Sequence, residues 1–147
     1  PFYKGEKPWG IKVDIAMPCA TQNEIGIKEA KQIIANGTKY YIEVANMPTT
    51  EEALNFLIDR KEVIVAPSKA VNAGGVCVSG LEMSQNSQRL SWTAEEVDEK
   101  LHNAMINIHK HSVEAAEKYG LGYDLVAGAN IAGFEKVAEA MMAQGIY

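Results

Sequence analysis

Three short polar stretches hold the residues that could do chemistry, and each of them follows an apolar segment. They contribute amides, hydroxyls and accessible backbone, which suit hydrogen bonding to an uncharged carboxamide or to sugar hydroxyls. They contain no obvious proton donor, nucleophile or metal-binding group. The pattern therefore predicts a surface that holds a ligand without catalytic groups of its own. The stretches are Cys19-Ala20-Thr21-Gln22-Asn23, Ala45-Asn46-Met47-Pro48-Thr49-Thr50 and Asn72-Ala73-Gly74-Gly75.

The third stretch suggests ligand binding most directly. Gly74 and Gly75 lack side chains, so a ligand can approach the backbone closely there. Ser79 places a hydroxyl one helical turn further along a helix expected over residues 76–90. Two simpler interpretations stay open. The glycines can serve turn geometry alone, and Lys69, the one cation in these turns, is most simply a solvated loop lysine.

The elements that must position these turns alternate between strands and helices. The apolar runs are typical of short buried strands, and amphipathic segments lie between them. The resulting βαβαβ order predicts an α/β fold with a parallel sheet and right-handed crossovers, in which all three turns meet at one edge. This is the size of one half of a doubly wound dinucleotide-binding domain, although no GxGxxG turn is present. We expect strands at 12–17, 40–44 and 63–66 and helices at 28–35 and 49–60.

The second half of the chain is expected to be helical. One helix should span 93–119 and another about 125–143. Thr93 with Glu96 forms a capping-box pattern, as does Thr49 with Glu52. We expect a single partial domain, with residues 1–92 forming the βαβαβ half plus a helix. Residues 93–147 are then C-terminal helices that pack back on it.

Composition narrows the classes of function. The 147 residues carry a formal net charge of −5 at pH 7, which argues against nucleic acid or an anionic membrane as partner. Cys19 and Cys77 lack the spacing of a metal site, and the three histidines are not paired at i,i+4, so we expect no metal site. We expect a cytoplasmic location. The absence of an initiator Met suggests a piece of a longer protein.

Five motifs together closely resemble the C-terminal part of hexameric glutamate dehydrogenase, and the bacterial NADP-dependent type fits best. The resemblance covers essentially the whole chain and implies interconversion of glutamate with 2-oxoglutarate and ammonia, using NADP or alternatively NAD. It also implies a homohexameric parent. The motifs are Pro18-Cys19-Ala20-Thr21-Gln22-Asn23-Glu24, Ala45-Asn46-Met47-Pro48-Thr49-Thr50, Asn72-Ala73-Gly74-Gly75-Val76, Ser79-Gly80-Leu81-Glu82-Met83 with Gln85-Asn86, and Val126-Ala127-Gly128-Ala129-Asn130-Ile131-Ala132-Gly133-Phe134.

The resemblance assigns roles to individual positions. The turns of Asn46 and Asn72, with Gly74, match those that hold the nicotinamide end of the coenzyme, and Ala20 and Thr21 match the turn beside its ribose. Val76 and Ser79 match residues of the substrate pocket, where the serine hydroxyl meets the side-chain carboxylate of glutamate. Alternatively, the Ser79 hydroxyl bonds within its own helix. Val44 departs from the pattern, because many family members have Gly there.

The family's catalytic lysine and aspartate and its Gly-rich pyrophosphate loop belong to earlier sequence, so the 147 residues alone are expected to be inactive. The NADP preference rests on resemblance alone, because the residue that reads the ribose 2′ position follows that loop. A related leucine, phenylalanine or valine dehydrogenase is the nearest alternative, although Ser79 and Leu81-Glu82-Met83 argue for glutamate. A free-standing, non-catalytic nucleotide-binding or assembly module is the alternative from another class.

Overall fold

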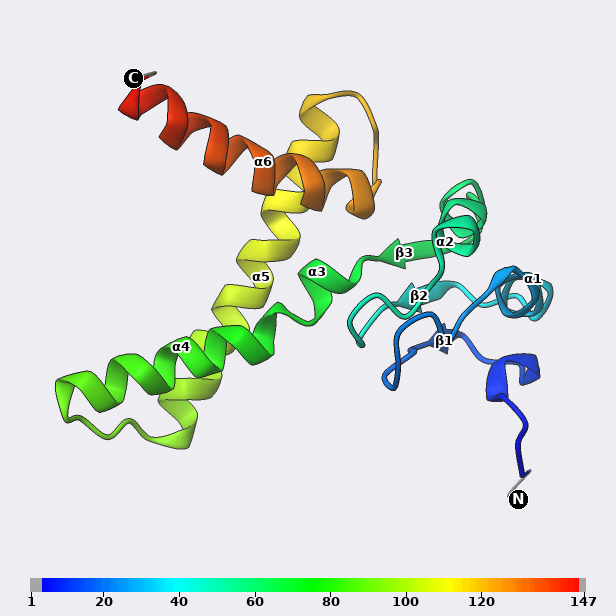
Figure 1. Cartoon of the computed structure of the whole chain (residues 1–147), viewed down its shortest axis with the longest axis horizontal. Helices are drawn as coiled ribbons and strands as arrows, with labels where there is room; N and C mark the ends of the chain where they lie inside the picture. The colour runs from blue at the N-terminus through cyan, green and yellow to red at the C-terminus, as the bar shows by residue number, and fades with distance from the viewer. Residues whose placement is uncertain (1–3, 146–147) are drawn as a thin grey trace. The chain divides into compact units, whose positions relative to one another are not determined.

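A computed structural model describes residues 4–145, and the chain divides into two compact units (Figure 1). The first unit comprises residues 1–68 and the second residues 69–147. The division lies between Ser68 and Lys69, so the long helix expected over residues 76–90 groups with the later helices rather than with the sheet. The expected division at residue 92 within a larger domain stays a prediction.

The first unit is built on a parallel sheet of three strands in the order β1-β2-β3. The strands are β1 (Ile15–Ala16), β2 (Tyr40–Ile42) and β3 (Ile64–Ala66), shorter than the runs predicted from the sequence. Ile15 pairs with Tyr40, which pairs with Ile64. The predicted α/β class and the parallel βαβαβ arrangement are confirmed.

One face of this sheet forms the core of the first unit. Successive side chains of a strand point to opposite faces. Ala16, Tyr41 and Val65 are buried at 4%, 0% and 8% exposure, whereas their neighbours Ile15, Tyr40 and Ile64 are exposed. The helices α1 (Ile27–Ala35) and α2 (Glu51–Ile58) pack against each other on one side of the strands (Figure 1). They bury Ala30, Ile33, Ala53 and Leu57.

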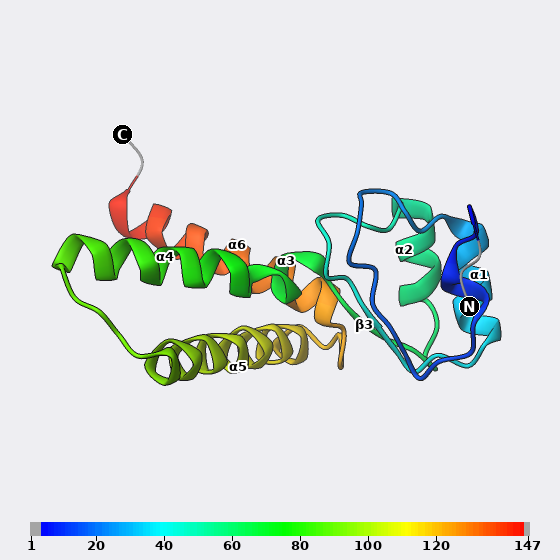
Figure 2. The ribbon, with the colours of Figure 1, turned by 90° about the horizontal axis from the view of Figure 1, so that it is seen from below.

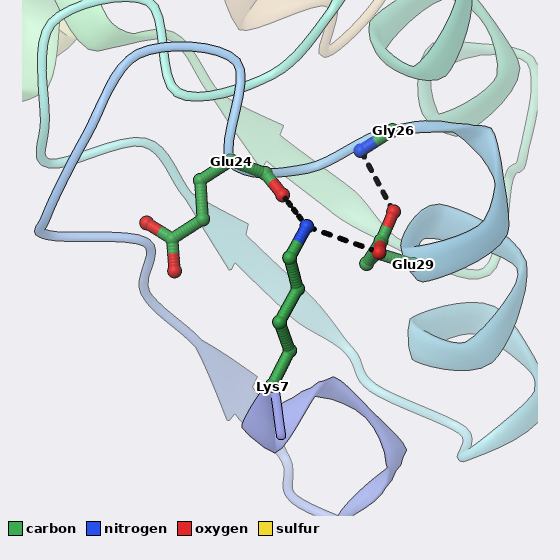
Figure 3. Close-up of polar contacts among 4 residues, drawn as sticks. All are labelled: Lys7, Glu24, Gly26 and Glu29. Carbon is green, nitrogen blue, oxygen red and sulfur yellow. Dashed lines mark hydrogen bonds and ion pairs between the residues drawn. The ribbon is translucent and has the colours of Figure 1, made fainter. Parts of the chain in front are cut away.

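A short 3-10 helix, η1 (Pro8–Gly10), precedes the first strand and buries Trp9. Lys7 attaches this segment to the start of α1, as Figure 3 shows. Its ammonium donates to the Glu24 carbonyl at 2.6 Å and pairs with Glu29 Oε1 at 3.1 Å, while Glu29 Oε2 accepts from the Gly26 N–H at 3.0 Å. The hydrogen bond from Lys7 lowers the pKa of Glu29, and backbone hydrogen bonds lower it further.

The second unit contains three long helices: α4 (Ala73–Gln88), α5 (Ala94–Lys118) and α6 (Leu125–Gln144). A single turn, α3 (Ser68–Val71), precedes them. Figure 2 shows α4 and α5 running alongside each other and joined at one end by a loop. None of the helices in the described residues is long and apolar enough to cross a membrane.

Both ends of α5 and the C-terminal end of α6 follow the sequence signals closely. The Thr93 hydroxyl accepts from Glu96 N at 3.2 Å and the Glu96 carboxylate accepts from Thr93 N at 2.7 Å, which is the predicted capping box. Gly120 adopts φ +73° just beyond α5, and Gly145 caps α6. The Asp124 carboxylate, which we had not predicted as a cap, accepts from Val126 N and Ala127 N at the start of α6.

Close packing of α6 on α5 depends on Gly128, which is buried. A Cβ atom at this position would overlap the carbonyl oxygen of Ser112 and lie 3.1 Å from Ala116 Cβ. Ser112, Ala115 and Ala116 are the buried residues of α5. The small residues at the start of α6 therefore differ in role, because Gly128 allows the close approach of α5 whereas nothing lies within 4 Å of a Cβ at Gly133.

Two local predictions are wrong. Thr49 does not cap α2: the N-cap is Thr50, while Thr49 is buried and its hydroxyl lies 2.6 Å from the Tyr41 hydroxyl. The helix expected from Val76 begins at Ala73, so Gly74 and Gly75 lie in its first turn rather than in a loop. Glycine disfavours helix, which is why local sequence placed the boundary too late.

Candidate functional site

The first two predicted turns lie side by side in the first unit and are joined through their backbones. The Pro18 carbonyl, just after β1, accepts from Val44 N at 3.2 Å and from Ala45 N at 2.9 Å. Further along the same turns, Asn23 N donates to the Met47 carbonyl at 3.0 Å. The expected meeting of these two turns at one edge of the sheet is therefore seen directly.

Both turns contain a residue in the left-handed region. Asn23 has φ 54° and Met47 has φ 49°. Asn tolerates this conformation, but it is uncommon for Met, and strained backbone often clusters at ligand-binding sites. Met47 is also 54% exposed, so hydrophobic burial does not explain its conformation. The second turn therefore contains an uncommon backbone conformation at Met47, next to a first turn whose Asn23 adopts a tolerated one.

The predicted coenzyme residues of these turns are all on the surface. Ala20 and Thr21 are exposed after β1, and Asn46 is exposed after β2. The backbone N–H of Thr21 donates to Glu24 Oε2 at 3.4 Å. Cys19, at the start of the first turn, is a free and exposed thiol that donates to the Met17 carbonyl at 3.3 Å.

The third predicted stretch is helical rather than a turn. Asn72 is the N-cap of α4 with backbone angles of the right-handed helix, and it is half-buried. A Cβ atom on Gly74 would lie 3.2 Å from Leu101 Cδ1 and 3.4 Å from Met105 Sδ. Gly74 therefore has a packing reason, the approach of α5, in addition to the predicted approach of a ligand. Gly75 faces open space.

The predicted substrate residues lie on the exposed side of α4. Val76 is 79% exposed, and Ser79 is exposed one turn later. The Ser79 hydroxyl donates to the Gly75 carbonyl at 3.1 Å, which is the alternative that the sequence left open. Its oxygen keeps acceptor capacity, but donation to a carboxylate requires the hydroxyl to rotate away from Gly75.

Lys69 is not simply a solvated loop lysine, because its ammonium donates to the side-chain oxygen of Asn130 on α6. This pair closes a loop of 61 residues within the second unit. Asn130 belongs to a motif that carries the family resemblance, but nothing in the spacing of the two residues predicts that they meet.

A buried polar group lies behind the turns of the first unit. Tyr41 is fully buried on β2, and burial raises the pKa of its hydroxyl well above the usual range; the nearby charge of Glu43 raises this pKa further. Its hydrogen bond to Thr49 acts in the opposite direction. Tyr41 thus stays neutral at physiological pH and ties β2 to the far end of the second turn.

The described residues hold no cluster of three or more His, Cys, Asp or Glu side chains that could bind a metal ion. His109 Nε2 lies 2.7 Å from the Tyr123 hydroxyl, and its ring lies 5.9 Å from that of Tyr123. What the site offers is hydrogen-bonding side chains and backbone. Asn46 and Asn72 belong to different units, so their meeting at one ligand stays a prediction.

Comparisons with known proteins agree with these motifs. Residues 1–145 match the Glutamate/Leucine/Phenylalanine/Valine dehydrogenase family. The NAD-specific glutamate dehydrogenase of Clostridium symbiosum is 72% identical over 145 residues, which cover 99% of this chain and 32% of that protein. The NADP-specific enzyme of Haemophilus influenzae is 52% identical over 151 residues, again covering 99% and 32%.

Solved structures show the same relationship. A glutamate dehydrogenase structure with 71% identity superimposes with a TM-score of 0.97, covering 99% of this chain and 32% of its own. A hetero-hexameric glutamate dehydrogenase from Thermus thermophilus, at 27% identity, gives 0.84 and covers 95% and 32%.

The fold and turns define a dehydrogenase-type α/β domain, and the chain belongs to the Glutamate/Leucine/Phenylalanine/Valine dehydrogenase family. It spans about a third of the length of the relatives it matches. The sequence-based preference for the NADP-dependent type stays a prediction, because the relatives include an NAD-specific enzyme at 72% identity and an NADP-specific one at 52%.

Proposed function

We propose that this chain is the C-terminal part of a glutamate dehydrogenase, an oxidoreductase that interconverts L-glutamate with 2-oxoglutarate and ammonia using a nicotinamide coenzyme. The observation that carries this proposal is the combination of 72% identity to such an enzyme and a TM-score of 0.97 to such a structure. The turns offer mainly amides, hydroxyls and backbone groups, which fits a part that binds coenzyme while catalytic groups come from elsewhere.

The proposed coenzyme residues are those that the resemblance indicates: Ala20 and Thr21 beside the ribose, and Asn46, Asn72 and Gly74 at the nicotinamide end. Exposure of Ala20, Thr21 and Asn46 after strands of a parallel sheet supports this role. For Asn72 and Gly74, at the half-buried start of α4, the support is the resemblance. Val76 and Ser79 are the proposed substrate residues. Their exposure on α4 leaves them accessible to a ligand.

Between the two coenzymes, we propose that NAD is preferred. The higher identity to an NAD-specific enzyme supports this choice, whereas the motifs of the present chain do not distinguish NAD from NADP. The parent protein is proposed to be a hexamer in the cytoplasm. Resemblance to a protein described as a hetero-hexameric glutamate dehydrogenase supports the hexamer, and identical subunits are what the family motifs imply.

Steady-state kinetics on the full-length protein test the proposal. We expect glutamate-dependent reduction of NAD with a higher kcat/KM than for NADP, and no turnover by the 147-residue chain alone, because substrate positioning and proton transfer groups would be missing. Reduction with leucine, phenylalanine or valine but not with glutamate would favour the related dehydrogenases. Absence of turnover with all four amino acids would favour a non-catalytic module.

A further inference from the structure

Glu43 is a buried carboxylate that the proposed function leaves without a role. It follows β2 directly and is only 3% exposed. Acidic side chains are rarely so fully buried unless they are paired, because removing a charge from water is costly without compensating hydrogen bonds. The hydrogen-bond partners of Glu43 therefore indicate which part of the backbone the buried carboxylate stabilises.

The backbone N–H and the side-chain carboxylate of Glu43 both form hydrogen bonds with the chain at the end of β3 and just beyond it. The Glu43 N–H donates to the Ala66 carbonyl at 3.0 Å, and Glu43 Oε2 accepts from the Ser68 N–H at 3.1 Å. The two bonds bracket Pro67, which is buried and has no N–H of its own. One residue thus fixes the backbone of the turn 66–68.

The residues that follow Glu43 fix the neighbouring turn. Val44 N and Ala45 N both donate to the Pro18 carbonyl after β1. Residues 43–45 therefore connect the chain after all three strands: to residue 18 through backbone, and to residues 66 and 68 through backbone and the Glu43 side chain. Asn46 follows immediately on this segment.

We propose that Glu43 is a positioning residue for coenzyme binding: by holding the Ser68 N–H, its carboxylate sets the start of α3 against the turn that carries Asn46. From Ser68 the chain continues to Asn72. The proposal rests on the proposed function, since it assigns Glu43 to the coenzyme turns of a dehydrogenase. Glu43 itself is expected to touch neither coenzyme nor substrate.

A positioning role for Glu43 and a purely stabilising role predict different effects of substitution on the enzyme's kinetic constants. A residue that only stabilises the fold would, when replaced, lower the unfolding midpoint and leave the kinetic constants of the folded enzyme unchanged. A positioning residue instead changes the kinetic constants for the coenzyme while the KM for glutamate stays the same, because small displacements at a binding turn are enough to impair reaction geometry.

Two substitutions in the full-length enzyme separate the hydrogen bond from the charge. Glu43→Met has similar length but no acceptor, and we expect its kcat/KM for NAD to fall roughly tenfold to a hundredfold, as for other small misplacements of binding groups. Glu43→Gln keeps a carbonyl acceptor for Ser68 and should retain most of the activity. The control is Glu62→Met, an exposed carboxylate of the same unit, which should behave as wild type.

The donor side provides a second test that does not depend on Glu43→Met folding. Ser68→Pro removes the N–H while suiting the first position of a helix, and should reproduce the loss in coenzyme kcat/KM. Ser68→Ala keeps the N–H and loses only the hydroxyl, so it should resemble wild type.

The outcomes are distinct. Wild-type kcat/KM for NAD in a folded Glu43→Met, or in Ser68→Pro where Glu43→Met does not fold, would overturn the positioning role while leaving the enzyme assignment intact. Equal losses in Glu43→Gln and Glu43→Met would also overturn it, because the hydrogen-bond acceptor would then not be what matters. A wild-type protein without glutamate-dependent reduction of NAD or NADP would instead refute the proposed function, and this inference with it.

Discussion

The two compact units use their apolar residues in opposite ways. In the first unit Ile25, Ile33, Tyr41 and Leu57 are less than 2% exposed, so the unit has a dense core of its own. In the second unit α4 has no buried residue, and large apolar side chains such as Met83 and Phe134 are more than 70% exposed. The second unit is held mainly where α5 and α6 approach closely.

The two units therefore position the proposed ligand-binding residues by different means. Backbone hydrogen bonds between turns fix Asn46 and its neighbours, with a buried core beneath them. In the second unit Val76 and Ser79 lie on a helix whose position depends on contacts such as Gly74 with Leu101. Variants in the full-length protein can break or sharpen this contrast.

The largest effect is expected at the crossing of α5 and α6. Gly128→Ala places a Cβ onto the carbonyl oxygen of Ser112, and backbone cannot yield as a flexible side chain can. We expect a loss of about 3 kcal/mol or more in the free energy of unfolding. Denaturant titration measures it. Gly133→Ala in the same helix is the control, because a Cβ there meets nothing within 4 Å. Equal stability of the two variants would show that the crossing is not close.

The next effect is on function rather than on stability. Ser79→Ala should lower kcat/KM for glutamate and 2-oxoglutarate by roughly tenfold to a hundredfold, about 1.4–2.7 kcal/mol, through loss of a charge-assisted hydrogen bond to the substrate carboxylate. The KM for the coenzyme should barely change. Rejection of substrates with an apolar side chain should relax, because the pocket no longer leaves a polar group unpaired.

The ratio of kcat/KM for glutamate to that for norvaline decides the Ser79 question. An unchanged ratio would mean that the hydroxyl serves only its bond to the Gly75 carbonyl. Ser84→Ala on the same helix is a matched control, because Ser84 also donates to a carbonyl four residues earlier, that of Gly80, at 2.9 Å.

Helix capping offers a smaller and directly paired comparison between the units. Thr93 makes the side-chain cap bond of α5, whereas Thr50 caps α2 without one. Thr93→Ala should therefore cost about 1 kcal/mol in the free energy of unfolding, and Thr50→Ala distinctly less. Thermal and denaturant unfolding measure both values. A larger cost at Thr50 would contradict the capping that we describe.

The smallest effect concerns Lys7 and Glu29 in the first unit. Because the folded pKa of Glu29 lies below its ordinary value of 4.5, the pair stabilises the fold fully above that pH. The stabilisation is lost as pH falls through the lowered pKa. Lys7 is about half exposed, so we expect Lys7→Met to cost less than about 1 kcal/mol. Unfolding titrations should show this gap at pH 7 and its disappearance in acid; a gap that persists in acid would exclude the ion pair as its cause.

The sequence predicted the α/β class, the strand positions and most helix ends, because these depend on local patterns. The Thr93 and Glu96 pair formed its capping box as expected. The similar Thr49 and Glu52 pair did not, because Tyr41, eight residues earlier, provides a buried partner for Thr49. Local spacing cannot reveal such competition.

The sequence predicted which turns lie at the edge of the sheet, but not the buried and long-range hydrogen bonds that hold them. The place of Asn46 after a strand correctly predicted that it is exposed beside the neighbouring turn, while its role at a coenzyme stays a prediction. The start of α4 was placed too late because two glycines obscured it, although contact with α5 fixes Gly74 there. Glu43 and the Lys69–Asn130 pair were missed, since their partners are distant in sequence and no spacing rule relates them.

Finally, the exposed row of Ile15, Tyr40 and Ile64 has a consequence for the self-association of the isolated 147-residue chain. These side chains stand next to one another on the open face of the sheet at 51%, 44% and 38% exposure. Parallel sheets usually have both faces covered. In isolation the chain should therefore self-associate as its concentration rises, and sulfate, which strengthens apolar burial, should promote this. The exposed face of the three strands should therefore limit the solubility of the isolated chain.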